Sequence, residues 1–251
     1  MSGEDLRHRR LMPWARRLAK RALVRKDVLQ HRNDPAIRPW MPLLAGARAG
    51  HIVTPSRAVT ASMAEALDFA ASGTVRPGDR VLDVGAGNGR QAIGLLQLGV
   101  AEYVGLEVIK DSVDYANGAF ASTGRARFVH FDVANDMYNP GGSLAPERAA
   151  FPFPDGSFDA VIAGSLYTHL GRFEVAQRYI DETARVLGET GRAYMSFFVS
   201  PPNEPTGSSV RTVFDRDAVL DAIGTHFTIE REGGGDSTDW HDQWRLYLRK
   251  V

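Results

Sequence analysis

Short apolar runs alternate with longer segments of helical periodicity from Pro55 onward. The apolar runs predict strands at 81–84, 103–108, 126–133, 160–164, 227–231 and 244–249, with one more inside 185–198, after a helix end and a glycine turn. The helical periodicity predicts helices at 55–72, 90–98 and 215–223. This alternation favours an α/β fold with a mostly parallel sheet. Only a short segment separates the last two strands, which favours an antiparallel hairpin.

A glycine-rich turn follows the first predicted strand, in the stretch VLDVGAGNGR. Glycine permits positive φ and lets a ligand approach the backbone without meeting a Cβ. A dinucleotide fingerprint needs GxGxxG or GxGxxA, but the sixth position counted from Gly85 is Arg90, and the run GNGRQA counted from Gly87 fits weakly. Asp83 lies two residues before Gly85, and its carboxylate suits a ligand carrying ammonium and sulfonium charges better than a pyrophosphate. The arrangement DxGxGxG resembles motif I of class I S-adenosylmethionine (AdoMet) dependent methyltransferases.

Two further blocks resemble the same family. They are FPFPDGSFDAVIAGSLYTHL at 151–170 and RVLGETGRAYMSFF at 185–198. Together with DVANDMYNPGGSL, they resemble a type 11-like bacterial subgroup with YNPxG, FPFPDxSFD and THL-like motifs, although Ala134 replaces the usual tyrosine of that subgroup. The resemblance runs from about Arg76 to Val251. It implies a Rossmann-like, doubly wound, seven-stranded sheet that is mostly parallel with an antiparallel last strand.

The resemblance also implies which residues hold the cofactor, AdoMet. Glu107 and Asp132 follow successive predicted strands, at the sheet edge where ligands bind in open α/β folds. In the family, the acid at Glu107 accepts hydrogen bonds from both ribose hydroxyls, the acid at Asp132 accepts from the adenine amino group, and Val108 and Val133 would pack on the ring. Alternatively, both acids are ordinary solvated strand ends. The expected cofactor-binding residues are Asp83, Gly85, Ala86, Gly87, Asn88, Gly89, Glu107, Val108, Asp132, Val133 and Ser165.

Methyl transfer from a sulfonium is an in-line displacement, which leaves the enzyme to align the acceptor and, for a hydroxyl, to remove its proton. His169, just past the fourth predicted strand, is the expected base, and Tyr167 is the expected contact to the acceptor. Each has a structural alternative, as a loop-bonding histidine or a packed tyrosine. Trp240 and His241 are weaker candidates. We expect no metal site.

Composition limits the alternatives. A chain of 251 residues that is 43% hydrophobic can bury the core of one α/β domain. The absence of cysteine excludes disulfides, cysteine zinc sites and a cysteine nucleophile. The chain has no run of about 18 apolar residues, the length that a membrane-spanning helix needs. We therefore expect a cytoplasmic protein.

Positive charge is concentrated at the N-terminal end of the chain. Residues 1–40 carry eleven Lys and Arg against four acids, a net charge of +7, so the remainder carries −7. Apolar residues recur at helical spacing after Pro13, which predicts a basic amphipathic helix. We expect a helical extension at 1–50 and the methyltransferase domain at 51–251. The favoured interpretation is that the extension packs on the domain. Alternatively, it recruits an anionic partner, whether a membrane surface, a nucleic acid or a phosphorylated substrate, or it is a targeting segment.

The favoured activity is O-methylation of a small molecule, a glycan or a secondary metabolite. An RNA methyltransferase recruited by the basic extension is one alternative, and a non-catalytic AdoMet-binding module is another. A base-modifying enzyme usually carries an NPPY-like run after the fourth strand to clamp a flipped base, whereas this chain has GSLY there. A nucleic-acid substrate is therefore disfavoured. The sequence leaves the oligomeric state open.

Overall fold

A computed structural model describes residues 54–200, 212–235 and 243–251, together with 23, 25–27, 29–31 and 33–35. The predicted helix after Pro13 lies largely outside these ranges, and Trp240 and His241 lie wholly outside them. The chain divides into two compact units, residues 1–61 and 62–251. The predicted boundary at residue 50 stays a prediction.

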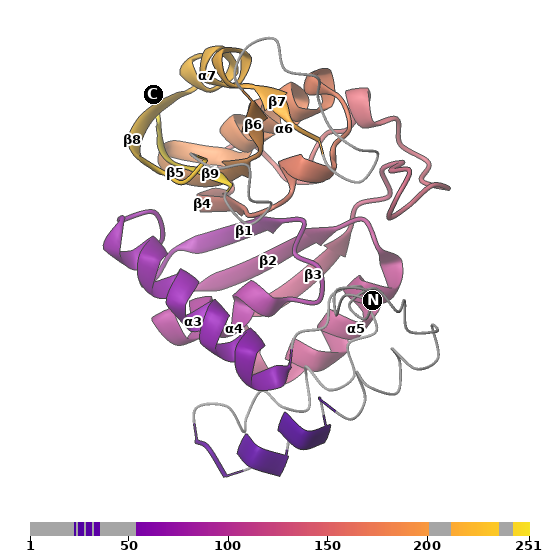
Figure 1. Cartoon of the computed structure of the whole chain (residues 1–251), viewed down its shortest axis with the longest axis vertical. Helices are drawn as coiled ribbons and strands as arrows, with labels where there is room; N and C mark the ends of the chain where they lie inside the picture. Colours follow the sequence, from indigo (N-terminus) through magenta and orange to yellow (C-terminus); the bar gives the residue numbers. More distant parts are fainter. Residues whose placement is uncertain are drawn as a thin grey trace, which may run out of the picture. The chain divides into compact units, whose positions relative to one another are not determined.

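A seven-stranded sheet organises the second unit, in the order β3-β2-β1-β4-β5-β9-β8 (Figure 1). The strands β3, β2, β1, β4 and β5 pair in parallel, whereas β9 is antiparallel to both β5 and β8. This arrangement confirms the predicted doubly wound α/β fold with an antiparallel last strand. The strands are β1 (Arg80–Val84), β2 (Glu102–Glu107), β3 (Ala126–His130), β4 (Phe158–Ala163), β5 (Leu187–Phe197), β8 (Phe227–Gly233) and β9 (Trp244–Lys250).

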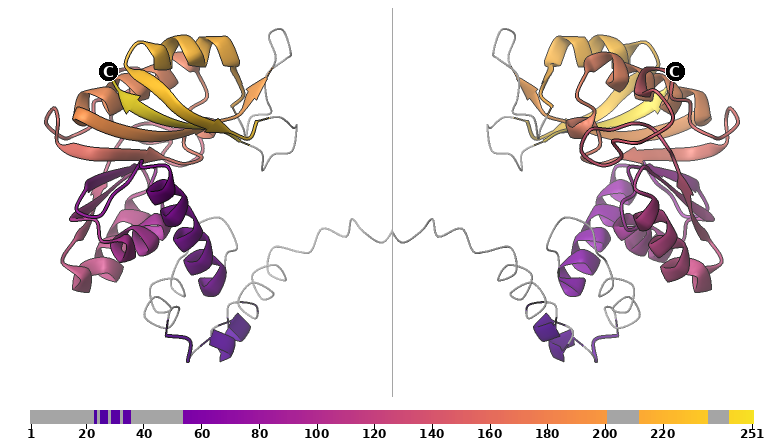
Figure 2. Two further views of the ribbon diagram at one scale, coloured as in Figure 1. Left: turned by 90° about the vertical axis from the view of Figure 1, so that its left-hand side faces the viewer. Right: turned by 90° about the vertical axis from the view of Figure 1, so that its right-hand side faces the viewer.

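Helices cover both faces of the sheet, with α6 and α7 on the side opposite α4 and α5 (Figures 1 and 2). Alternation along β1 sends Leu82 and Val84 into the core under α6 and α7. On the other face, Tyr103 packs on Phe128, which packs on Phe120 of α5. The helices are α3 (Pro55–Ala71), α4 (Arg90–Leu98), α5 (Lys110–Phe120), α6 (Phe173–Val186) and α7 (Arg216–Gly224). A separate pair, β6 (Val199–Ser200) and β7 (Phe214–Asp215), lies beyond β5.

Two predicted details of the strands are wrong. The third strand ends at His130 instead of residue 133, because the chain beyond it pairs with its own loop: the Leu144 N–H donates to the Asp132 carbonyl, and the Ala134 N–H to the Leu144 carbonyl. The expected glycine turn at 188–191 is part of β5 itself, where the pairing with β4 shifts register. Asp132 consequently lies in a loop, two residues past the strand.

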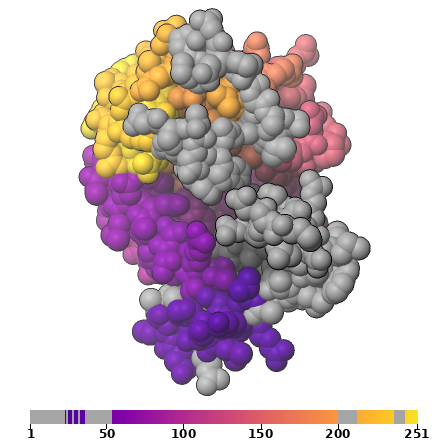
Figure 3. All heavy atoms as spheres, in the orientation of Figure 1, coloured from indigo at the N-terminus to yellow at the C-terminus, as the bar shows by residue number. Residues whose placement is uncertain are grey.

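The last two strands bind the C-terminal half of α3. Asp68 accepts hydrogen bonds from the Tyr247 hydroxyl on β9 and from Arg231 on β8. The Arg231 guanidinium also lies 3.8 Å from the centroid of the Tyr247 ring. In Figure 3 the yellow atoms of these strands accordingly lie directly against the purple atoms of the helix region.

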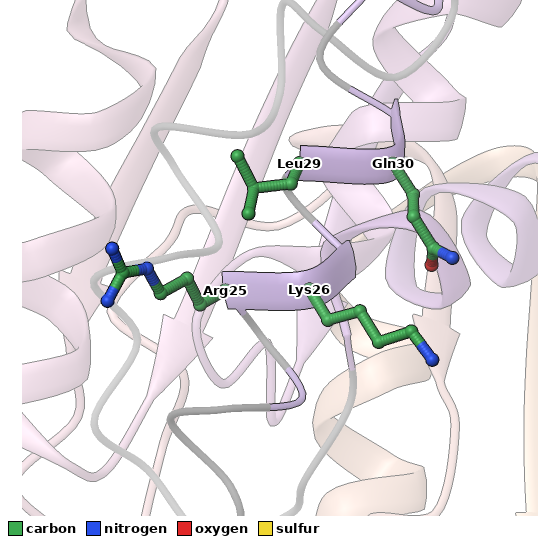
Figure 4. A pocket seen from close by; sticks show the side chains of 4 residues that line it. All are labelled: Arg25, Lys26, Leu29 and Gln30. Carbon is green, nitrogen blue, oxygen red and sulfur yellow. The ribbon is translucent and has the colours of Figure 1, made fainter.

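In the first unit, Asp27 stabilises the start of α3. Its carboxylate accepts hydrogen bonds from both the backbone N–H and the hydroxyl of Ser56, so a helix amide that begins without a partner is satisfied. Nearby, Leu23 and Leu29 are exposed. Arg25, Lys26, Leu29 and Gln30 line a surface depression (Figure 4). Within the described residues, no helix has the length and apolar character needed to cross a membrane.

Candidate active site

The glycine turn connects the end of β1 to the start of α4, with φ of 80°, 55° and 81° at Gly85, Gly87 and Gly89. A Cβ at Gly89 would lie 2.5 Å from the Phe128 ring and 2.8 Å from Phe120, so this glycine lets the helix pack closely on the sheet. A Cβ at Gly87 would meet nothing within 4 Å. The backbone of Gly87 is therefore open to a ligand, whereas Gly89 has a packing role.

Glu107 links this turn to the end of β2. Its Oε2 accepts the Gly87 N–H at 2.8 Å, and its Oε1 accepts the Ile109 N–H at 2.9 Å. The side chain is buried. Each carboxylate oxygen can accept a second hydrogen bond, so the group can still receive two hydroxyls from a diol. Glu107 is thus not a solvated strand end, and its geometry suits a ribose.

Asp83 lies on β1 beneath the turn and is almost completely buried. Its Oδ2 accepts the Tyr103 hydroxyl at 2.5 Å, while no described residue donates to its Oδ1. Burial raises the pKa of Asp83 to about 7, an effect that the Tyr103 hydrogen bond and the charge of Arg90 only partly offset. A carboxylate with one free oxygen in this position suits a cationic ligand group.

Asp132 closes the loop that follows β3. Its carboxylate accepts hydrogen bonds from the Asn139 amide at 3.0 Å and from the Ser143 hydroxyl at 2.7 Å. These hydrogen bonds hold the pKa of Asp132 below its usual value. Asp132 therefore maintains the loop, and it retains capacity to accept one more donor such as an adenine amino group. Sequence reasoning did not anticipate this structural task.

The remaining predicted cofactor residues differ in their exposure. Ala86 and Val133 are buried, whereas Asn88 and Val108 are partly exposed. Ser165 is exposed just past β4 and is the only described residue other than glycine with positive φ, at 59°. Its hydroxyl accepts a hydrogen bond from the Gln243 amide. Gln243 is thus a hydrogen-bond partner of Ser165, and the sequence analysis did not identify Gln243 as part of the site.

The two catalytic candidates differ sharply in their surroundings. Tyr167 is fully buried. The centroids of its ring and the Phe197 ring are 4.3 Å apart, and its hydroxyl donates a hydrogen bond to the Met195 sulfur. Burial raises its pKa. His169 is only partly buried, and its ring meets the Tyr138 ring edge-on at 5.3 Å. The buried Tyr167 hydroxyl does not suit a contact with an acceptor, whereas the His169 side chain is partly exposed, with its Nδ1 buried.

The loop after β3 also reaches His169. The Asn135 side-chain amide donates to the His169 carbonyl at 3.0 Å, and the Asn135 carboxamide oxygen accepts the Tyr138 N–H. Sequence reasoning missed Asn135 and Tyr103. For Tyr103 a signal existed, since it is the hydroxyl-bearing residue at the start of the run YVGLEV, which is otherwise apolar up to Glu107.

Residues 82–195 match the family model described as a methyltransferase domain. The chain is 31% identical to 27-O-demethylrifamycin SV methyltransferase of Amycolatopsis mediterranei, over 53% of this chain and 43% of that protein. It is 33% identical to demethylmenaquinone methyltransferase of Beutenbergia cavernae, over 52% and 45% of the two chains. The chain therefore spans about half the length of these curated relatives.

A similar fold occurs in magnesium protoporphyrin IX methyltransferase of Synechocystis PCC 6803, solved with bound AdoMet. The TM-score is 0.54 at 18% identity, covering 92% of this chain and 97% of the other. This likeness concerns the fold alone. Residues 82–195 are thus similar to a methyltransferase domain, and the chain shares its fold with solved class I methyltransferases.

Proposed function

We propose that the chain is an AdoMet-dependent methyltransferase that methylates a hydroxyl of a small molecule, a glycan or a secondary metabolite. The observation that carries the proposal is the open Gly87 backbone held by the buried Glu107 carboxylate, beside Asp83. The names of two relatives, the rifamycin and menaquinone methyltransferases, support a small-molecule acceptor.

The residues present fit the cofactor. Glu107 would hold the ribose hydroxyls with its remaining acceptor capacity, and the free Oδ1 of Asp83 would face the ammonium group. Asp132 would accept from the adenine amino group, and Val108 and Val133 would flank the ring. The other proposed contacts come from the turn and from the end of β4, at Gly85, Ala86, Gly87, Asn88, Gly89 and Ser165. Bound AdoMet supplies the methyl group.

The chain's own task is to align the acceptor and accept its proton. His169 would take the hydroxyl proton as the acceptor oxygen attacks, because imidazole titrates near neutral pH. The neighbouring Tyr138 ring restricts how the imidazole can turn. We no longer propose Tyr167 as a contact to the acceptor, because its hydroxyl is bonded inside the core.

Calorimetric titration with AdoMet, S-adenosylhomocysteine (SAH) and NADH tests the cofactor. We expect low-micromolar binding of the first two and none of NADH. A methylation assay on a panel that includes 27-O-demethylrifamycin SV, demethylmenaquinone and simple sugars then tests the acceptor. Absent AdoMet binding, or tighter NADH binding, would overturn the proposal. A product methylated on nitrogen or carbon would refute the hydroxyl acceptor alone.

The basic N-terminal residues favour a second candidate, a methyltransferase for RNA or another anionic substrate. Arg25 and Lys26 are exposed beside Leu29, next to the charge excess of residues 1–40 (Figure 4). Binding of the intact protein to RNA or anionic vesicles that falls steeply with salt, and is lost on deleting residues 1–35, would favour this candidate. If the residues only cover the domain, deletion lowers stability without any salt-dependent loss of binding.

A further inference from the structure

Tyr103 and Asp83 form a buried pair on neighbouring strands. The side chain of Tyr103 is fully buried and that of Asp83 nearly so. Asp83 lies opposite Gly105 in the β1–β2 ladder, two residues beyond Tyr103, so no side chain of β2 separates the carboxylate from the tyrosine hydroxyl. The Tyr103 ring packs on Phe128 at 5.6 Å. The hydroxyl is therefore held in a fixed position.

The other charged groups near Asp83 leave it without a cationic partner. Arg90 on α4 points its guanidinium to Glu65 of α3 at 2.8 Å, and Glu107 lies on β2. On the β4 side, the residue in register with Asp83 is the apolar Ile162. Among the described residues, the Tyr103 hydroxyl is thus the only group that donates a hydrogen bond to the carboxylate.

We propose that Tyr103 is a positioning residue: it holds Oδ2 of Asp83 so that Oδ1 faces the ammonium group of the cofactor, and cofactor binding is coupled to loss of the Asp83 proton. This inference rests on the proposed function. It assigns Tyr103 a task that acts through another side chain and predicts a pH dependence of cofactor affinity.

The direction of the pH dependence follows from the charges. A neutral carboxyl attracts an ammonium group weakly, whereas the ionised form attracts it strongly in a buried site. Because burial places the pKa of Asp83 near 7, affinity increases from pH 5.5 towards pH 8. The Tyr103 hydrogen bond favours the ionised form, so its removal shifts the rise in affinity to higher pH.

The test is SAH titration from pH 5.5 to 8 with wild type, Tyr103→Phe and Asp83→Asn. We expect wild-type affinity to rise with pH by up to about tenfold per unit below the Asp83 pKa. Tyr103→Phe should shift this rise upward by about one unit, leaving affinity about fivefold weaker at pH 7 and about tenfold weaker well below pH 7. Asp83→Asn should show no rise.

Two controls separate positioning from general damage. Tyr247→Phe removes a similar tyrosine–aspartate hydrogen bond, to Asp68, and should leave the pH profile unchanged. 5′-Methylthioadenosine lacks the ammonium group, so its affinity should stay flat with pH in every variant. Titration of wild type in buffers of different ionisation enthalpy should also show release of up to about one proton at pH 6.

Affinity in Tyr103→Phe that is unchanged, or weaker by the same factor at every pH, would overturn the inference. Wild-type binding without proton release would also overturn it. These results leave the proposed function intact, because wild type still binds SAH. If wild type fails to bind SAH at any pH, the proposed function itself fails. Thermal unfolding of Tyr103→Phe checks the fold, and the wild-type proton release tests the coupling without any substitution.

Discussion

The backbone N–H of Gly87 donates to the carboxylate of Glu107 across 2.8 Å, although the two residues are twenty positions apart. This contact joins the turn after β1 to the end of β2. The same buried acid therefore shapes the turn and presents its remaining lone pairs to a ligand. A ligand bound here meets a turn that is already ordered, which lowers the entropic cost of binding.

Replacing Glu107 with alanine should weaken SAH binding by roughly tenfold to a hundredfold, because a charged acceptor for two hydroxyls is lost. Calorimetric titration measures the change. Glu102→Ala is the matched control, since Glu102 starts the same strand and only forms an exposed ion pair with Arg127. Equal affinities in the two variants would show that Glu107 has no part in binding.

His169→Ala should lower turnover by at least about tenfold while SAH affinity stays within about threefold, because the proposed cofactor contacts lie on other side chains. The pH–rate profile should lose the limb that reports the general base. His226→Ala, which removes a surface pair with Asp181, should leave turnover unchanged. Full activity in His169→Ala would give the residue a structural role.

Breaking the buried ion pair between Arg192 and Asp79 should cost about 3–5 kcal/mol of the free energy of unfolding, because Arg192→Ala leaves a buried carboxylate without its cation. The Arg192 guanidinium also donates to the Gly73 carbonyl. Arg80→Ala, at the exposed pair with Asp159, should cost less than about 1 kcal/mol. Urea unfolding measures the free energy of unfolding of both variants. Similar losses in Arg192→Ala and Arg80→Ala would contradict this ranking.

Glu182 should make the protein sensitive to acid. Burial raises its pKa, but hydrogen bonds from Arg185 and the Phe151 N–H outweigh this effect and hold the pKa below the usual 4.5. Its stabilising contribution is therefore present above pH 4.5 and is lost as pH falls through the lower, folded-state pKa. Glu182→Gln should unfold more easily at pH 7 and lose less stability below pH 4.5. The exposed Glu174→Gln should follow wild type throughout.

Alanine at Gly89 should destabilise the fold, because its Cβ would overlap the rings of Phe128 and Phe120 and φ is 81°. The same substitution at Gly118, an exposed position of α5 with nothing within 4 Å of the added Cβ, should stabilise by about 0.5–1 kcal/mol. Thermal unfolding of both variants tests whether the two substitutions have these opposite effects on stability. A stable Gly89→Ala would mean that the turn readily rearranges.

Local signals in the sequence predicted most of the sheet. Apolar runs marked the strands, and α4 spans residues 90–98 as expected. Glycine spacing after β1 identified the turn, and Glu107 marks the end of β2. These features could be predicted because they depend on residues close together in the chain. Hydrophobic periodicity and backbone preference act over the same short range. The doubly wound sheet with its antiparallel last strand followed from the resemblance to a known family, and the short connection before β9 also favoured an antiparallel pair, whereas the strand order comes from the structure.

Contacts between distant segments decided the rest. Only the folded chain shows that Asp132 belongs to a loop closed by Ser143, that Tyr167 is buried against Met195, and that Tyr103 reaches Asp83. The identity of an acidic or hydroxyl-bearing residue does not reveal whether its side chain contacts water, a cofactor or a neighbouring strand. Its partner is set by the tertiary fold. Parallel strands paired through crossover connections bring Tyr103 to Asp83, and the loop after β3 folds back to bring Ser143 to Asp132.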